Sequence, residues 1–138
     1  MESQRFIKFR YYVLQGTIIF IYLCSVYGFP GMDRLGKTAA FLEDALRQLG
    51  LTDKEANEFI IYWLPILEAN EYNYIRFATA EEIEANMSLN ITPAPDSLIR
   101  VVMVFKGLKE PIEVNEQVLT TPERVGFTVV EWGGTEIK

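Results

Sequence analysis

The spacing of apolar residues changes once along the chain, and this change constrains the fold more than any other feature. From Phe41 to Leu67 the apolar residues recur at helical spacing, whereas from Tyr72 they alternate with polar residues as in a strand. Pro65 lies just before the change, and a helix ends or kinks there because proline lacks an N–H and clashes with the preceding turn. We therefore expect a helical half followed by a strand-rich half.

Two helices are expected in the first half. An apolar stripe over residues 41–49 predicts the first helix, and Gly50 suits the position after its end, where a positive φ costs little. The second helix begins with a capping box, in which Thr52 is the N-cap and Glu55 stands three residues later. Because the link between them is short, the two helices are expected to form a hairpin.

About five strands are expected in the second half. The run LIRVVMVFK at 98–106 is apolar on both faces apart from Arg100, which is typical of a central strand. The last strand is expected to end before Gly133-Gly134. Short loops between consecutive strands favour antiparallel meander or Greek-key pairing. The predicted fold is therefore α+β, a helix hairpin packed on an antiparallel sheet, with strands at 72–77, 87–91, 98–106, 113–119 and 127–132.

The N-terminal segment has two interpretations. Residues 11–29 contain no charge, and as a helix they would span about 28 Å, which is close to the thickness of a bilayer core. Basic residues before this run favour a signal sequence or signal anchor, which implies an envelope or secreted protein. The run is also rich in β-branched and aromatic residues, and a turn at Gln15-Gly16 would make it a core hairpin of a cytoplasmic protein. The expected organisation is this apolar segment (1–29), a linker (30–37) and one domain (38–138).

Charge and composition exclude several function classes. Residues 38–138 carry eight basic and seventeen acidic residues, which disfavours nucleic-acid binding. The chain has no histidine, and its single cysteine, Cys24, lies in the apolar run. Histidine-based triads, histidine-ligated zinc and cysteine metal clusters are thereby excluded, and no nucleotide-binding glycine motif is present. We therefore expect a protein without a cofactor or metal that is not an enzyme.

Two kinds of site remain as candidates. A hydrolase would need a pair of carboxylates, and those near aromatic or turn features are Glu58, Glu68, Asp96 and Glu131. A binding surface would combine stacking aromatics with polar side chains, although core packing and helix capping explain the same residue types. The candidate binding residues are Trp63, Glu68, Asn70, Asn73, Arg76, Glu131 and Trp132.

Three phrases carry a resemblance to a known family: NEFIIYWLPILEANEYNYIRF at 57–77, PAPDSLIRVVMVFKGL at 93–108 and GFTVVEWGG at 126–134. Together with residues 38–51 they resemble an uncharacterised domain at the C-termini of bacterial proteins, many of them exported. The resemblance covers roughly residues 36–134, whereas the first 28 residues do not match. No activity is attached to that family, so the resemblance implies a domain located at the cell envelope and does not imply a reaction.

The predicted function is a non-enzymatic envelope module that binds or organises a protein or polysaccharide partner. The alternatives are a carboxylate-based hydrolase and a subunit whose apolar N-terminus packs against a partner protein. Membrane association through residues 11–29 is part of the leading hypothesis.

Overall fold

β2 (Ser97–Leu108) is the central strand of a three-stranded sheet, as the sequence predicts. In this computed structural model, which describes residues 37–138, β1 (Tyr72–Phe77) and β3 (Thr128–Glu136) flank it. β1 pairs with β2 in antiparallel register, with Tyr72 opposite Leu108. β3 pairs with β2 in parallel register, with Ser97 opposite Thr128. The fold is α+β, and the sheet is mixed.

The expected all-antiparallel sheet is therefore wrong at β3. Parallel pairing requires the chain to return to the starting end of the sheet, and residues 109–127 make this crossing without a helix. The strands expected at 87–91 and 113–119 are irregular, apart from an isolated bridge at Asn115. Met87, Leu89 and Ile91 are half-buried and the residues between them are exposed, so the alternation is present there without strand pairing. The described residues hold three strands rather than about five.

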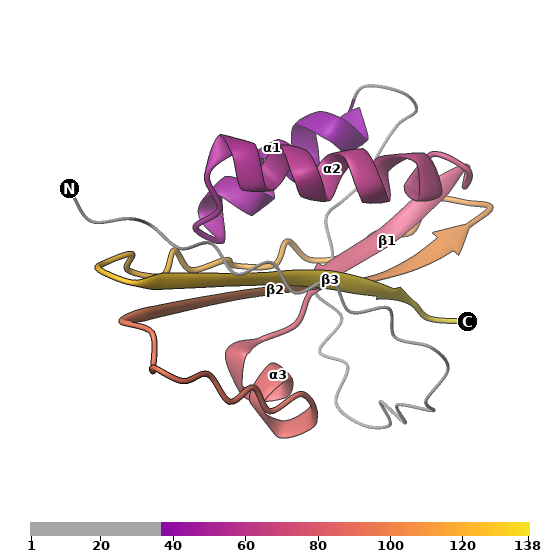
Figure 1. The fold of residues 1–138 in the computed structure, drawn as a ribbon. Helices are drawn as coiled ribbons and strands as arrows, with labels where there is room; N and C mark the ends of the chain where they lie inside the picture. Colours follow the sequence, from indigo (N-terminus) through magenta and orange to yellow (C-terminus); the bar gives the residue numbers. More distant parts are fainter. Residues whose placement is uncertain (1–36) are drawn as a thin grey trace.

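The predicted helix hairpin is confirmed. α1 (Lys37–Gln48) and α2 (Asp53–Leu67) pack side by side on one face of the sheet (Figure 1). The capping box at the start of α2 is present, since Thr52 N–H donates to the Glu55 carboxylate at 2.8 Å and Glu55 N–H donates to Thr52 Oγ1. Gly50 follows α1 with a φ of 87°. Pro65 lies inside the last turn of α2, which ends two residues later.

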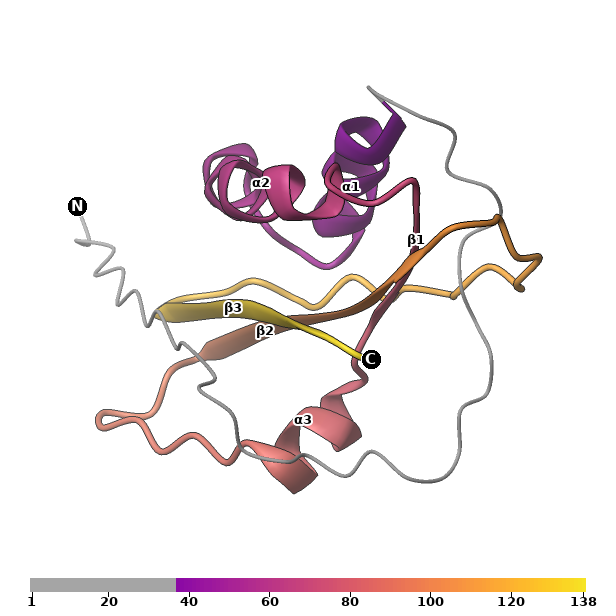
Figure 2. The same ribbon diagram turned by 90° about the vertical axis from the view of Figure 1, so that its right-hand side faces the viewer.

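A short third helix, α3 (Ala80–Asn86), lies on the opposite face of the sheet (Figure 2). The sequence predicted a strand-rich second half without a helix, and this segment is acidic and offers few apolar residues. Thr79 and Glu82 nevertheless form a second capping box, and Ile83 is buried. The same spacing that predicted the start of α2 therefore also marks α3.

The core lies between the helix hairpin and the sheet. Its largest fully buried side chains include Phe59 of α2, Phe77 of β1 and Phe105 of β2. β3 continues through Gly133-Gly134 instead of ending before them. A Cβ on Gly134 would lie 2.9 Å from the Trp63 ring, so glycine here allows α2 to approach the sheet closely.

Both interpretations of residues 11–29, and nearly all of the linker 30–37, fall outside the described residues. Of the helices in residues 37–138, none has the length and apolar character needed to cross a bilayer. The fold therefore leaves both interpretations of the N-terminal segment as predictions.

Candidate functional site: a cavity beside α3

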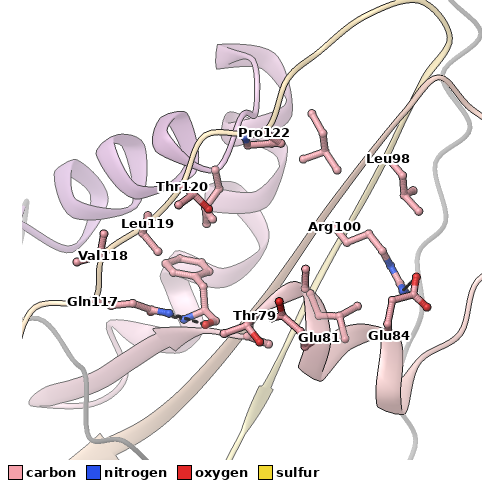
Figure 3. A pocket seen from close by; sticks show the side chains of 16 residues that line it. Thr79, Glu81, Glu84, Leu98, Arg100, Gln117, Val118, Leu119, Thr120 and Pro122 are labelled. Atoms are coloured by element: carbon pink, nitrogen blue, oxygen red, sulfur yellow. Dashed lines mark hydrogen bonds and ion pairs between the residues drawn. The ribbon is translucent and has the colours of Figure 1, made fainter.

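A cavity of about 460 Å³ lies where β1 passes into α3. Figure 3 shows it between three parts of the chain: residues 77–84, the first half of β2, and the segment 117–122. Its volume is within the range of small-ligand and peptide-anchor pockets. Residues distant in sequence thus form one concave surface.

The cavity combines apolar walls with a polar rim. Phe77, Ile83 and Ile99 are buried residues of its lining. Val118, which is 88% exposed, and Leu98, which is 37% exposed, extend the apolar surface to the solvent. The polar lining residues are Thr79, Glu81, Glu84, Arg100, Gln117 and Thr120. Such a surface can hold a ligand that is partly apolar.

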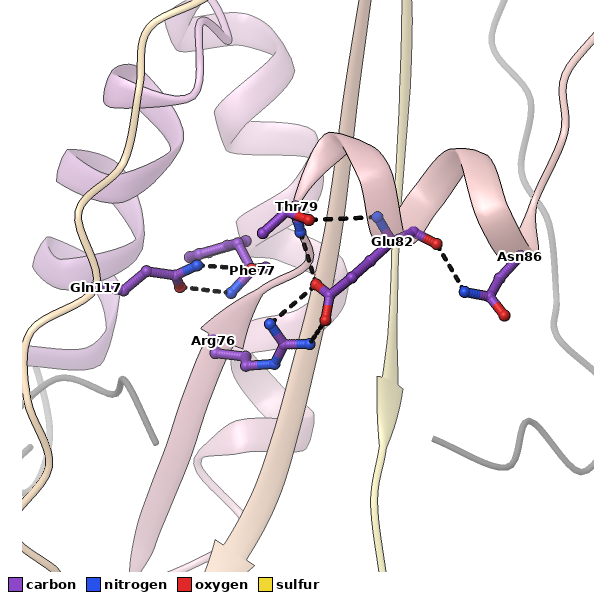
Figure 4. Close-up of polar contacts among 6 residues, drawn as sticks. All are labelled: Arg76, Phe77, Thr79, Glu82, Asn86 and Gln117. Carbon is purple, nitrogen blue, oxygen red and sulfur yellow. Dashed lines mark hydrogen bonds and ion pairs between the residues drawn. The ribbon is translucent and has the colours of Figure 1, made fainter. Parts of the chain in front are cut away.

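Two sets of hydrogen bonds fix the walls (Figure 4). The guanidinium of Arg76 on β1 donates to both carboxylate oxygens of Glu82 on α3, at 2.6 and 3.0 Å. The Glu82 carboxylate also accepts the Thr79 N–H at 2.8 Å. Across the cavity, the Gln117 side chain bonds to the backbone of Phe77. β1 therefore anchors both α3 and the segment 117–122.

These contacts also set the ionisation of the carboxylates. Hydrogen bonds from Arg76, and a weaker one from Thr79 N–H, lower the pKa of Glu82 although partial burial opposes them. Hydrogen bonds from its own backbone N–H and from the Thr79 hydroxyl lower the pKa of Glu81. Both groups therefore carry a negative charge at neutral pH.

Arg100 brings a largely buried charge to the cavity. Its side chain is 8% exposed, and its Nε donates to the Glu131 carboxylate of β3. The Glu84 carboxylate lies 3.8 Å from Nη1, and within residues 37–138 that nitrogen has no hydrogen-bond acceptor. Glu131 therefore offsets most of the Arg100 charge, which leaves the rim acidic.

Within residues 37–138, the first half of β2 has an edge along the cavity that no strand pairs with. β1 ends at Phe77, opposite Met103, and one further bond follows, from Ala78 N–H to Val102 O at 2.9 Å. Backbone groups alternate in direction along a strand, so Leu98 and Arg100 point their N–H and C=O groups to the same side as Val102. No strand of residues 37–138 pairs with them there.

The structure places the predicted binding residues elsewhere. Trp63 and Trp132 belong to an aromatic cluster under α2, where the Trp132 ring lies 5.4 Å from that of Phe59. Arg76 forms an ion pair with Glu82 of α3, and Glu131 forms an ion pair with Arg100. These two side chains position residues that line the cavity, and neither lines it itself.

The remaining three predicted binding residues lie at the turn between α2 and β1. Asn70 Nδ2 donates to Asn73 Oδ1 at 2.9 Å, and Asn73 Nδ2 donates to Leu67 O at 2.8 Å. Glu68 is the exposed C-cap of α2. The first two therefore order the turn, and the seven predicted residues do not form one surface.

The four candidate carboxylates are also spread over the molecule. Glu58 and Glu68 are ten residues apart along α2 and its cap, which corresponds to about 15 Å. Asp96 accepts the Phe127 N–H at 2.6 Å at the start of the sheet. Glu131 faces the opposite side of the sheet from α2 and pairs with Arg100. None of the four lines the cavity.

The residues that line the cavity are not among those predicted from the sequence. Thr79 and Glu82 form a capping box, a sequence pattern that predicts the start of α3, which is one wall of the cavity. Gln117 and Val118 carry none, since their position depends on a crossing that only the folded chain defines. Among residues 37–138, no group of three carboxylates or cysteines is arranged to hold a metal ion.

No family model, curated protein or solved structure matches the chain. No relative therefore supplies a substrate or a set of site residues for the cavity. The resemblance of three sequence phrases to a bacterial C-terminal domain stays a prediction.

Proposed function

We propose that this domain is a non-catalytic binding module whose partner occupies the cavity beside α3. The observation that carries the proposal is a cavity of about 460 Å³ that joins apolar walls, an acidic rim and a strand edge that is unpaired in the described part of the chain. Exposed apolar side chains beside a concave surface are typical of interaction sites. Val118 and Leu98 provide them here.

The chemistry of the lining favours binding over catalysis. The chain has no histidine, and the pKa of Glu81 at the rim is lowered by hydrogen bonds, which makes this carboxylate a weaker base. Arg100 and Gln117 are engaged in structural contacts. No observation favours the carboxylate hydrolase as a second candidate.

We also propose that the module works at the bacterial cell envelope, where its partner is a protein or a polysaccharide. The uncharged run at residues 11–29 and the resemblance to exported proteins support this cellular location. Fractionation of cells that produce the full chain tests it. Recovery of the chain in the membrane or extracytoplasmic fraction is expected, and recovery in the cytosol alone contradicts the proposal.

Site-specific photo-crosslinking tests the cavity itself. Val118 is replaced by p-benzoyl-phenylalanine in the full chain, and Ile61, which is 75% exposed on α2 and does not line the cavity, provides the matched control. We expect a discrete cross-linked product from position 118 and none from position 61. Absence of a product at 118, or equal products at both positions, contradicts the proposed function.

A further inference from the structure

We infer that the partner enters the cavity as an extended, positively charged peptide segment that adds to the free edge of β2. This inference rests on the proposed function and names its ligand class. In strand addition, backbone hydrogen bonds supply affinity, and pockets for alternate side chains supply specificity. The cavity offers both features.

The edge is long enough for such an addition. Leu98 to Val101, which precede the residue bonded to Ala78, span four residues, or about 13 Å of strand. The backbone groups of Leu98 and Arg100 are directed toward the side on which β1 has already ended. α3 and the segment 117–122 stand on either side of the vacant position (Figure 3). A short peptide strand can therefore continue the sheet where β1 stops.

The outer edge of β1 does not offer the same opportunity. There the Gln117 side chain already occupies both the N–H and the C=O of Phe77. The unpaired length of β2, by contrast, adjoins a cavity with room for side chains. The geometry thus favours peptide binding at the edge of β2, between α3 and residues 117–122.

Charge selects the kind of peptide. Glu81 and Glu84 lie at the rim, and Glu84 is 63% exposed. Glu116 and Glu123 directly flank the lining segment 117–122. Residues 38–138 as a whole carry nine more acidic than basic residues. Lysine or arginine side chains are therefore attracted to this edge and acidic ones are repelled.

The apolar walls favour aliphatic side chains at some positions of the bound peptide. Side chains on successive residues of an added strand point to opposite faces of the sheet. Ile83 and Leu98 present apolar surface to one part of the cavity, and Val118 does so at the rim. The best ligand is therefore a segment that combines aliphatic with basic residues.

Peptide binding to the full chain tests the charge requirement. The probe is a fluorescein-labelled peptide Gly-Lys-Leu-Lys-Val-Lys-Leu-Gly, followed by anisotropy, and a second peptide has glutamate in place of each lysine. We expect binding of the first peptide only. E81Q/E84Q is expected to weaken it roughly three- to tenfold, since each exposed charge contact contributes modestly. E43Q/E71Q removes the same charge from exposed residues outside the cavity and is expected to bind as the unmodified chain does.

Amide hydrogen exchange tests the strand addition. Saturating peptide is expected to slow exchange at the Leu98 and Arg100 N–H groups by roughly tenfold or more, because they become hydrogen-bonded. The N–H groups of Ile99 and Val101, which point toward β3, are expected to change little. A peptide methylated on alternate backbone nitrogens is expected not to bind.

Three outcomes overturn the inference. They are equal binding of the acidic and basic peptides, unchanged exchange at Leu98 and Arg100, and a cross-link from position 118 that maps to residues 1–36 of the same chain. If position 118 cross-links to another molecule while the peptide results are negative, the proposed binding function stands and only the ligand class is wrong. If position 118 gives no product, the proposed function itself fails.

Discussion

The Gln117 side chain bonds to the backbone of Phe77 in the manner of a neighbouring strand. Its Nε2 donates to Phe77 O at 2.7 Å, and its Oε1 accepts the Phe77 N–H at 2.9 Å, although forty residues separate the two. One side chain thereby protects the exposed end of the β1 edge and fixes one wall of the cavity. Unprotected edges invite pairing with other chains.

Replacing Gln117 with alanine is expected to lower the free energy of unfolding by roughly 1 to 3 kcal/mol, because two hydrogen bonds are lost. It is also expected to increase self-association. Urea denaturation and size-exclusion chromatography measure these effects. Gln48→Ala is the matched control, since Gln48 makes one exposed bond to Asp44. Equal effects of the two substitutions would show that Gln117 has no special role at the edge.

Glu131→Gln is expected to be strongly destabilising. It leaves the guanidinium of Arg100, a side chain only 8% exposed, without its main counter-charge. Loss of one partner of a buried ion pair costs about 3 to 5 kcal/mol, whereas replacement of both partners by apolar residues is often neutral. The double variant R100M/E131L is therefore expected to be more stable than E131Q in urea denaturation. A double variant less stable than E131Q would contradict this account.

The pair of Arg124 and Glu55 predicts a pH dependence of stability. Burial raises the pKa of Glu55, but hydrogen bonds from Arg124 and Thr52 outweigh it, so the pKa lies below its ordinary value of 4.5. Because the folded pKa is the lower one, this stabilisation is complete above about pH 4.5 and is lost as the pH falls through the folded value.

Glu55→Gln keeps a capping side chain but removes this charge. It is expected to reduce stability at pH 7 and to flatten the loss of stability on acidification below about pH 4.5, as measured by urea midpoints over a pH series. Glu43→Gln, at an exposed position on α1, is the control and is expected to follow the unmodified chain. An unchanged acid profile for Glu55→Gln would contradict the assignment.

Gly134→Ala and Gly133→Ala are a matched pair on β3. A Cβ at 134 would lie 2.9 Å from the Trp63 ring and 3.0 Å from Met103 O, whereas a Cβ at 133 would meet nothing within 4 Å. The first substitution is expected to cost about 1 to 3 kcal/mol through overpacking, and the second is expected to be neutral or slightly stabilising. Thermal denaturation compares them, and equal melting temperatures would argue against the close approach of α2.

The predictable parts of the fold are those that local chemistry determines. Thr52 and Glu55 begin α2 through contacts within one turn, and the apolar run around Val101 forms the central strand, flanked by β1 and β3. The direction of β3 could not be predicted, because it depends on how residues 109–127 cross the molecule. The candidate site was missed for the same reason. The cavity exists because β1 ends at Phe77, opposite Met103, whereas β2 extends back to Ser97. Local sequence patterns do not predict this difference in strand length.

The most direct test of the central claim is the cross-link from position 118 in the presence of an excess of the lysine-rich peptide. If the cavity beside α3 binds a basic segment of a partner, the cross-linked product decreases with this peptide and persists with its glutamate counterpart, and position 61 gives no product in either case. A product from position 118 that neither peptide reduces would contradict the account.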